Sequence, residues 1–326
     1  MAADVAGLGG EFVEEKQAKG RSPSQDAIRE FRRNKVAVTG FIFVVALFVV
    51  AVFAPVFTPY HYAVQNVKMT RAKPMTGYDI TPDRLELCHW AGTPVEWGCA
   101  IYLLGSDSLG RDMVSRVVYG ARISLTVAVV ASLVSLIIGI IYGTVSGFSG
   151  GSVDNVMMRI IDFLWAMPML PLIILMTVYF KTAARAGTTE GVVGFLISLD
   201  QAAGGLLFIF IAIGALGWLG LARLARGQVL SVKQKEFVEA AEALGGTNTR
   251  IIFKHLLPNI IGVLVIAESM AIPGYIFLES ALSFIGLGVN PPVPSWGAMI
   301  STGYLGIRSN PHLVLVPGID CYNISV

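Results

Sequence analysis

The chain has 326 residues, of which 54% are hydrophobic and only 14% are charged. Together with a mean hydropathy of +0.67, this composition departs from that of soluble domains and is typical of a membrane protein. The formal net charge of +2, without long blocks of one sign, argues against a nucleic-acid partner. Three cysteines without Cys-x-x-Cys spacing argue against a metal centre and a disulfide-rich scaffold.

Residues 1–35 form a polar segment that ends in a cluster of cations: Arg29, Arg32, Arg33 and Lys35. The segment is too long and too acidic for the n-region of a signal peptide. Residues 36–57 are therefore interpreted as an uncleaved first transmembrane helix, since about 20 apolar residues cross a bilayer. Because cations accumulate on the cytoplasmic side of such helices, the cluster predicts a cytoplasmic N-terminus.

Residues 58–120 are polar and contain prolines, which predicts an extracytoplasmic segment. Cys88 and Cys99 fall in it, where oxidation is permitted, so a disulfide between them is one hypothesis and two free thiols the other. Asp112 and Arg116 have the spacing of an ion pair on a helix. The apolar residues around them predict that this helix lies flat on the outer membrane surface or meets a substrate-delivering protein.

Residues 121–316 hold four further apolar runs, at 123–148, 157–180, 206–221 and 260–287. In the first of these, a glycine recurs every four residues at Gly139, Gly143 and Gly147, which predicts close packing against another helix. In the second, the spacing of Arg159 and Asp162 predicts an ion pair that anchors the span near the membrane surface. In the last, Pro273 predicts a kink.

A sixth apolar run starts at Leu313, and the sequence printed after it is shorter than a bilayer crossing. The sequence therefore predicts an all-α polytopic membrane protein with five complete transmembrane helices and an incomplete sixth. Two carboxylates fall inside the fifth run, where each costs about 3 kcal/mol to insert and is a functional hypothesis by default. Glu268 is a candidate for a polar translocation path, whereas Glu279 is expected to hydrogen-bond a neighbouring helix or loop.

Residues 223–258 form a long, cation-rich insert, which the preceding cations and spans place in the cytoplasm. Its periodicity predicts two short amphipathic helices separated by Gly245 and Gly246, the second capped by Thr247 or Asn248 and ending before Pro258. A passive connection needs neither matched apolar faces nor an elbow. Small alanines beside carboxylates therefore indicate a surface that docks another protein.

The insert also resembles a known family. Glu239-Ala240-Ala241, then Gly245, then Leu257-Pro258 is similar to the cytoplasmic EAA loop of permeases in ATP-binding-cassette importers. His255 and Asn259 resemble the dipeptide and oligopeptide branch of that family. The segments 104–112, 150–154 and 279–288 are similar to further blocks of the same branch, so that the resemblance covers about residues 30–316.

The resemblance implies the type I permease fold, with 121–316 as the core permease domain, and a C-type permease subunit of an importer of dipeptides or oligopeptides. It implies a location in the lipid of the inner (plasma) membrane and three kinds of protein partner: a homologous permease subunit, two ATP-binding subunits or domains that hold ATP and Mg, and an extracytoplasmic substrate-binding protein. The residues that would couple to the ATPases are Glu239, Ala240, Ala241, Leu244, Gly245, His255 and Pro258.

No Gly-x-x-x-x-Gly-Lys-Ser/Thr occurs, and no catalytic triad or cofactor motif is evident, so we expect a non-enzyme without a cofactor of its own. An ion-coupled secondary transporter with a proton site at Glu268 or Asp162 is the first alternative. An inactive, truncated scaffold is the second, because residues 317–326 bear no likeness to the final helix of the family. Peptide length, and nickel as a different cargo, are left open.

Overall fold

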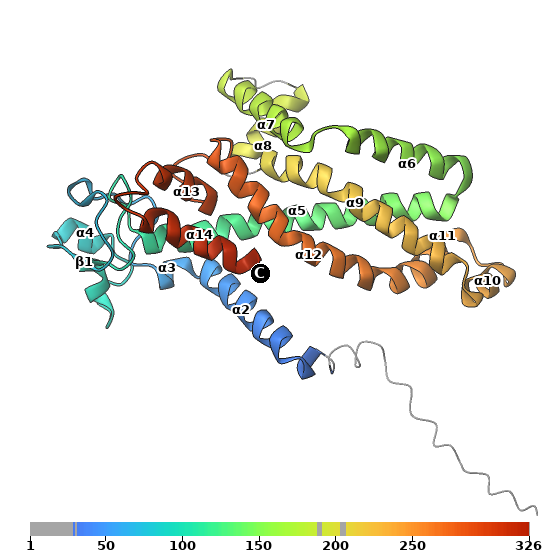
Figure 1. Ribbon diagram of the computed structural model, residues 1–326, viewed down its shortest axis with the longest axis horizontal. Coiled ribbons are helices and arrows are strands. Elements are labelled where there is room, and N and C mark those ends of the chain that lie inside the picture. Colours follow the sequence, from blue (N-terminus) through green and yellow to red (C-terminus); the bar gives the residue numbers. More distant parts are fainter. Residues whose placement is uncertain (1–28, 30, 188–190, 203–206, 326) are drawn as a thin grey trace, which may run out of the picture. The chain divides into compact units, whose positions relative to one another are not determined.

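A computed structural model describes residues 29, 31–187, 191–202 and 207–325. The described part is mostly helical, as the sequence predicts, with one small antiparallel sheet in which Thr76 pairs with Tyr102 (Figure 1). The contacts divide the chain into two units, residues 1–46 and 47–326. The shorter elements are α3 (Ala54–Phe57), η1 (Val67–Met69), β1 (Thr76–Gly77), α4 (Pro82–Glu86), η2 (Glu96–Ala100), β2 (Ile101–Tyr102), α8 (Gly191–Ala202), α10 (Glu236–Ala243), α11 (Asn248–Arg250) and η3 (Ile251–Leu256).

The first unit contains the start of α2 (Lys35–Val52). The Asn34 side chain accepts hydrogen bonds from the backbone N–H groups of Val36 and Ala37 at 3.1 and 3.2 Å. It therefore satisfies donors that have no partner inside the first turn of a helix. By length and composition α2 is suited to cross a membrane, in agreement with the expected first span.

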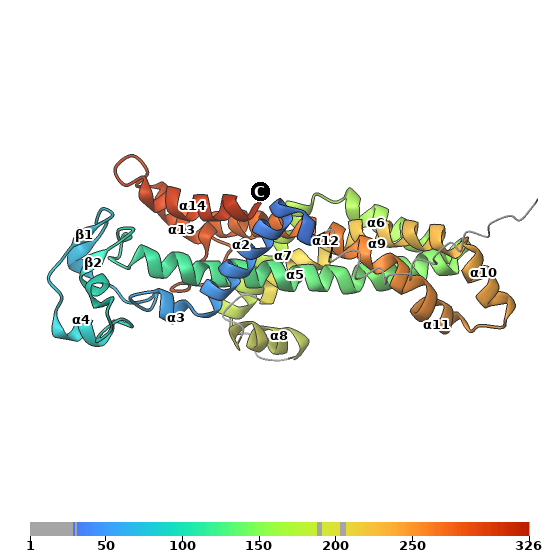
Figure 2. The same ribbon diagram turned by 90° about the horizontal axis from the view of Figure 1, so that it is seen from below.

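The second unit is built on three long helices, α5 (Met113–Ser149), α9 (Leu207–Lys233) and α12 (Leu257–Phe284), which lie side by side (Figures 1 and 2). The predicted glycine stripe of α5 faces α9. A Cβ on Gly143 would lie 2.6 Å from Ala225 Cβ, and one on Gly147 would lie 3.0 Å from Arg226 O. The prediction of close helix packing at these glycines is confirmed, because the two backbones meet where the side chains are missing.

The expected third span at 157–180 is divided into two helices. The chain forms α6 (Gly151–Ala166) and α7 (Met169–Arg185), which are bent by 83° relative to each other. The bend lies at Met167 and Pro168, where both residues have extended backbone angles. Proline disfavours helical geometry in the residue before it and cannot donate a backbone hydrogen bond, which explains a break at this position.

Among the described residues, three helices are long and apolar enough to cross a membrane, or four if α6 and α7 are counted as one span. The three are α2, α5 and a continuous helical segment at Asn248–Phe284. The expected fourth span becomes the first part of α9, and its first residue, Leu206, lies outside the described residues. The helix α12 continues through Pro273, where a kink was expected.

The C-terminal part forms α13 (Trp296–Tyr304) and α14 (His312–Ser325), which pack against each other and against α12. Trp296 is fully buried and donates a hydrogen bond from Nε1 to Val117 O at 3.2 Å. Residues 317–325, predicted as an atypical C-terminus, are helical and belong to α14.

Residues 58–112 form an irregular segment at one end of α5, whereas α10 lies at the opposite end (Figure 1). Cys88 and Cys99 are joined by a disulfide and are buried with Tyr60 in a small apolar cluster. The third cysteine, Cys321, is not part of this disulfide and lies in α14. The structure therefore confirms the hypothesis that Cys88 and Cys99 form a disulfide.

Candidate functional site

The candidate site is an elbow formed by α10, α11 and η3, residues 236–256. Its position is fixed by Val238, which is fully buried although its helix neighbours are exposed. Val238 belongs to an apolar cluster with Val229 of α9, Leu256 of η3 and Ile260 of α12. Burying one such side chain stabilises a fold by about 1.5 to 3 kcal/mol. The Val238 face therefore attaches α10 to the bundle, and the opposite face of α10 is exposed.

Gly245 and Gly246 end α10 in a defined turn. The N–H of Gly246 donates to Ala241 O at 3.0 Å, and the N–H of Gly245 donates to Glu242 O at 2.9 Å. These two bonds, with Gly245 at a φ of +79°, form the Schellman motif that closes helix C-termini. Thr247, one of the two predicted caps, then accepts a 3.4 Å hydrogen bond from Arg250 N. The elbow is therefore a fixed turn.

The prediction of a separate second helix that stops before Pro258 is wrong. Residues 251–256 form a π-helical turn that runs into α12, so the chain is helical from Asn248 to Phe284. Pro258 lies in the first turn of α12 and does not break it. The wider turn relieves the clash that proline causes inside an α-helix, and Asn259 Nδ2 donates to His255 O at 2.6 Å. The second arm of the elbow is therefore continuous with α12.

The exposed face of the elbow contains a hollow of about 230 Å³. Leu244, at its edge, is 89% exposed and adds an apolar side chain to the rim of the hollow. Glu239 and Ala240 are exposed on α10, and the His255 ring lies 6.4 Å from the Phe237 ring. The lining residues are Ala241, Leu244, Gly245, Gly246, Arg250, Ile251, Lys254 and His255. The arrangement is suited to receive an apolar side chain of a partner between charged groups.

A polar network that the sequence did not predict ties α9 to its neighbours beside the elbow. Arg226 donates two hydrogen bonds of 2.5 Å to the carboxylate of Asp154, which also accepts from Ser146 Oγ. Lys233 Nζ donates to Phe148 O at 2.9 Å. Asp154 and Arg226 are 72 residues apart, so spacing along the chain gave no indication of the pair.

The predicted ion pair between Arg159 and Asp162 is also wrong. Asp162 Oδ1 lies 2.6 Å from Arg223 Nη2 of α9, whose guanidinium stacks at 3.9 Å on the Trp165 ring. The pair joins two helices instead of stabilising one. Its exposure to solvent limits its contribution to about 0 to 1 kcal/mol.

The two carboxylates of α12 are both buried and both hydrogen-bonded to serines of α5. Glu279 accepts from Ser124 Oγ at 2.9 Å and from Ser283 Oγ at 2.7 Å, as the helix-contact prediction requires. Glu268 accepts from Ser135 Oγ at 3.2 Å and from Tyr275 OH at 2.9 Å. The sequence identified both carboxylates but could not identify their α5 partners.

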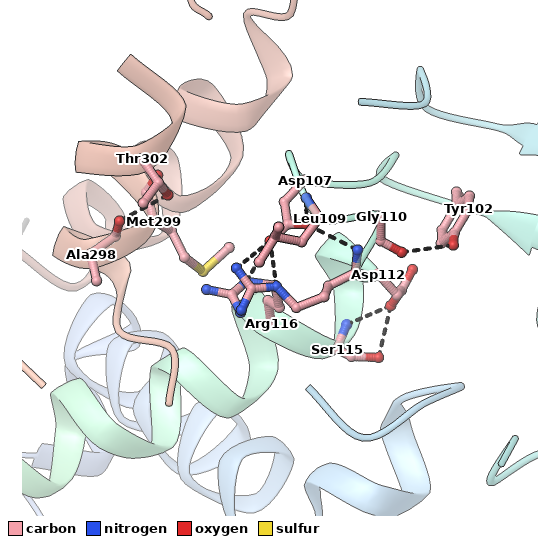
Figure 3. Close-up of polar contacts among 11 residues, drawn as sticks. Tyr102, Asp107, Leu109, Gly110, Asp112, Ser115, Arg116, Ala298, Met299 and Thr302 are labelled. Atoms are coloured by element: carbon pink, nitrogen blue, oxygen red, sulfur yellow. Dashed lines mark hydrogen bonds and ion pairs between the residues drawn. The ribbon is translucent and has the colours of Figure 1, made fainter. Parts of the chain in front are cut away.

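At the other end of α5, Figure 3 shows a second polar cluster. Asp112 caps α5 by accepting from Ser115 N at 2.7 Å and Ser115 Oγ at 2.8 Å. Arg116 lies 3.4 Å from Asp107, which also pairs with Arg111 at 2.7 Å. The expected pair of Asp112 with Arg116 is therefore wrong, and the expected flat surface helix is the buried first turn of the 37-residue α5.

No group of three or more His, Cys, Asp or Glu side chains within the described ranges could hold a metal ion. The match to known proteins covers the elbow and most of the helix bundle. Residues 135–319 match the family described as the binding-protein-dependent transport system inner membrane component. The chain belongs to this family. Residues 22–74 match the N-terminal transmembrane domain of oligopeptide transport permease C.

Several known proteins are similar to this chain along most of its length. The oligopeptide transport system permease protein OppC of Haemophilus influenzae is 37% identical over 95% of this chain and 88% of that protein. OppC of Bacillus subtilis is 37% identical over 91% and 83%, respectively. The dipeptide transport system permease protein DppC of Bacillus subtilis is also 37% identical, over 88% and 76%. Residues 135–319 include the whole elbow, which is therefore part of the family match.

A solved structure is also similar. The inward-facing MetNI methionine ABC transporter contains a chain that is 21% identical, with a TM-score of 0.47, over 65% of this chain and 92% of that one.

Proposed function

We propose that this chain is a transmembrane permease subunit of an ATP-driven importer of dipeptides or oligopeptides and forms half of its translocation pathway. The relatives with 37% identity are named as oligopeptide and dipeptide permeases, and they match along most of both chains. The proposal includes the type I permease fold, at least five transmembrane helices, and a cytoplasmic N-terminus. It also includes a homologous permease subunit as the second half of the pathway.

The elbow is the observation that carries this proposal. It combines a fixed turn, an exposed Leu244 beside a hollow, and a helical connection without a break to α12. Two partner ATPases that hold ATP and Mg would grip Glu239, Ala240 and Ala241 and move α12 as they close. The permease chain then acts as a lever that exposes the pathway alternately to the two sides of the membrane.

Glu268 has a positioning role in the proposed mechanism. Its carboxylate is held by Ser135 and Tyr275 within this chain and is 3% exposed. A group that must bind a passing peptide or proton needs access, whereas a buried and fully bonded carboxylate fixes the distance between α5 and α12. We therefore assign Glu268 to holding these helices together beside the pathway.

Co-purification of the ATPases tests the proposal. Replacing Ala241→Trp fills the hollow and should reduce the amount of ATPase that stays with the permease at least tenfold. Ala91→Trp, at an exposed alanine of the irregular segment, is the matched control and should retain the ATPase. Full retention of the ATPase by Ala241→Trp, with the variant folded and inserted in the membrane, would show that the elbow is not the coupling site.

A further inference from the structure

A buried carboxylate near the end of α12 joins three elements. Glu279, which is 0% exposed, accepts hydrogen bonds from Ser124 Oγ of α5 at 2.9 Å and from Ser283 Oγ of α12 at 2.7 Å. Ser283 Oγ in turn accepts from Ser295 Oγ at 3.2 Å, and Ser295 is the N-cap of α13. We name these four side chains the Glu279 joint. All four are buried, and together they connect α5, α12 and α13.

The start of α13 is held closely at the Glu279 joint. Ser295 Oγ also accepts a hydrogen bond from Ala298 N at 3.3 Å, so one hydroxyl both caps α13 and bonds to α12. A Cβ on Gly297 would collide with the backbone of Ser280. The backbones of α13 and α12 therefore touch beside the joint, and α13 is attached to α12 by packing as well as by hydrogen bonds.

A second serine–glutamate pair fixes the register of α5 against α12. Ser135 Oγ of α5 donates to the Glu268 carboxylate of α12 at 3.2 Å. The two serines are eleven residues apart along α5, and the two glutamates are eleven residues apart along α12. Eleven residues make about three helical turns, so both pairs lie on one face of each helix and are about 16 Å apart. Two such points oppose both sliding and rotation of one helix relative to the other.

The chemistry of the Glu279 joint indicates more than packing. Burial of a carboxylate is costly in a membrane, and an apolar side chain would pack α12 against α5 without that cost. A fully hydrogen-bonded polar network, in contrast, specifies one arrangement of the helices that carry it. Both oxygens of Glu279 have serine donors within the described ranges. The joint is therefore suited to fix the position of α13 relative to α12.

The Glu279 joint lies at one end of a continuous helical segment whose other end is the second arm of the elbow. The chain is helical from Asn248 to Phe284, and α12 continues through Pro273. Figures 1 and 2 show α13 at the end of α12 that is remote from α10. A movement of the elbow therefore has a helical connection to the joint, and the joint connects α12 to α13.

We propose that Glu279 is a positioning residue that makes α13 move together with α12. When the ATPases displace the elbow, the segment 285–304 at the other end of the helix is then displaced with it. Because the ATPases move the elbow only under the proposed function, this role rests on that function. Glu279 acts on α13 through the hydroxyls of Ser283 and Ser295, whereas the Glu268 pair holds α5 against α12.

The first test measures the distance between spin labels on α12 and just after α13 in the assembled importer. The labels are attached at exposed positions, Ile266→Cys and Leu305→Cys, with Cys321→Ser and with the native disulfide kept. Nucleotide-free and vanadate-trapped importers should give the same distance within about 2 Å, the size of ordinary helix adjustments. With Glu279→Leu added, the distance distribution of the trapped importer should broaden, because α13 is no longer held by the joint.

The second test measures ATP-driven peptide uptake into proteoliposomes that contain the assembled importer and its binding protein. Glu279→Leu should lower uptake about tenfold or more while the ATPases stay bound, because the joint is lost and the elbow is unchanged. Glu279→Gln should retain most of the uptake, since its amide oxygen can accept the same serine hydroxyls. The matched control is Thr126→Val, which removes a hydroxyl of α5 that donates to Arg122 O of its own helix, and it should transport like wild type.

The outcomes separate the role of Glu279 from the proposed function. If vanadate trapping changes the spin-label distance of the otherwise wild-type importer by about one helical turn, 5.4 Å, then α13 moves independently of α12. The role of Glu279 is then wrong, and the importer is unaffected. If Glu279→Gln is as inactive as Glu279→Leu, hydrogen bonding to the serines is not what Glu279 provides, and its assigned role is again wrong. If wild type with both ATPases bound shows no ATP-dependent peptide uptake, the proposed function and the role of Glu279 fail together.

Discussion

At the scale of single residues, Asp112 is notable because a buried carboxylate caps the longest helix. Its side chain is 3% exposed, and Oδ1 has no hydrogen-bond partner among the described residues. Burial therefore raises the pKa of Asp112 to about 6, while hydrogen bonds from Ser115 oppose the rise. Asp112 therefore combines a favourable interaction, the cap on α5, with an unfavourable one, the burial of its charged form.

The raised pKa predicts a pH dependence of stability. Between the unfolded pKa of about 4 and the folded pKa of about 6, the folded state binds more protons than the unfolded state. The free energy of unfolding should therefore fall by about 2 to 3 kcal/mol as the pH rises through this window. Asp112→Asn keeps a cap and removes the titration, so its melting temperature should change less between pH 4.5 and 7. Equal pH dependence in wild type and variant would contradict the assignment.

At the scale of elements, the contact between α5 and α9 holds the second unit together. The sequence predicted the glycine stripe but not its partner, which proved to be Leu221, Ala225 and Arg226 of α9. Contacts of this kind rely on close backbone approach, because lipid tails compete with any apolar side chain for the same surface. The elbow depends on this contact, since α9 leads directly into α10.

Gly143→Leu tests the contact. The added side chain would collide with Ala225 and with the backbone of Ala222 and Arg226, and overpacking of this kind costs about 1 to 3 kcal/mol. The melting temperature of the solubilised protein should fall by several degrees. Gly262→Leu on α12, where a Cβ meets nothing within 4 Å, is the control and should melt like wild type. The packing argument fails if the two variants melt alike.

At the scale of the whole molecule, the irregular segment 58–112, which contains the disulfide, and the elbow lie at opposite ends of α5 (Figure 1). If the chain is oriented as proposed, the two ends face opposite sides of the membrane. The disulfide then persists because its side is oxidising, whereas the elbow meets ATPases on the reducing side. One chain would thus carry a disulfide-bonded outer segment and a coupling site for the ATPases at opposite ends.

Thiol labelling of intact cells tests this orientation. In a variant that keeps the native disulfide, a cysteine introduced as Ala91→Cys at an exposed position of the irregular segment should be labelled by a membrane-impermeant maleimide in closed cells. A single cysteine introduced as Ala243→Cys at the elbow, with the three native cysteines replaced by serine, should be labelled only after the membrane is opened. Labelling of Ala243→Cys in closed cells would reverse the topology and remove the proposed coupling to cytoplasmic ATPases.

The sequence by itself determined the helical membrane class, the glycine stripe, the small residues of the elbow and the two buried carboxylates. These features are local, because hydrophobic length, residue size and spacing along one helix suffice to specify them. Only the tertiary structure decided the partners: Arg223 for Asp162, Arg226 for Asp154, and Ser135 for Glu268. It also decided that the second arm of the elbow continues into α12 and that the third span is bent. Which side chains pair across two helices depends on how the helices pack. The periodicity of one helix does not specify this packing.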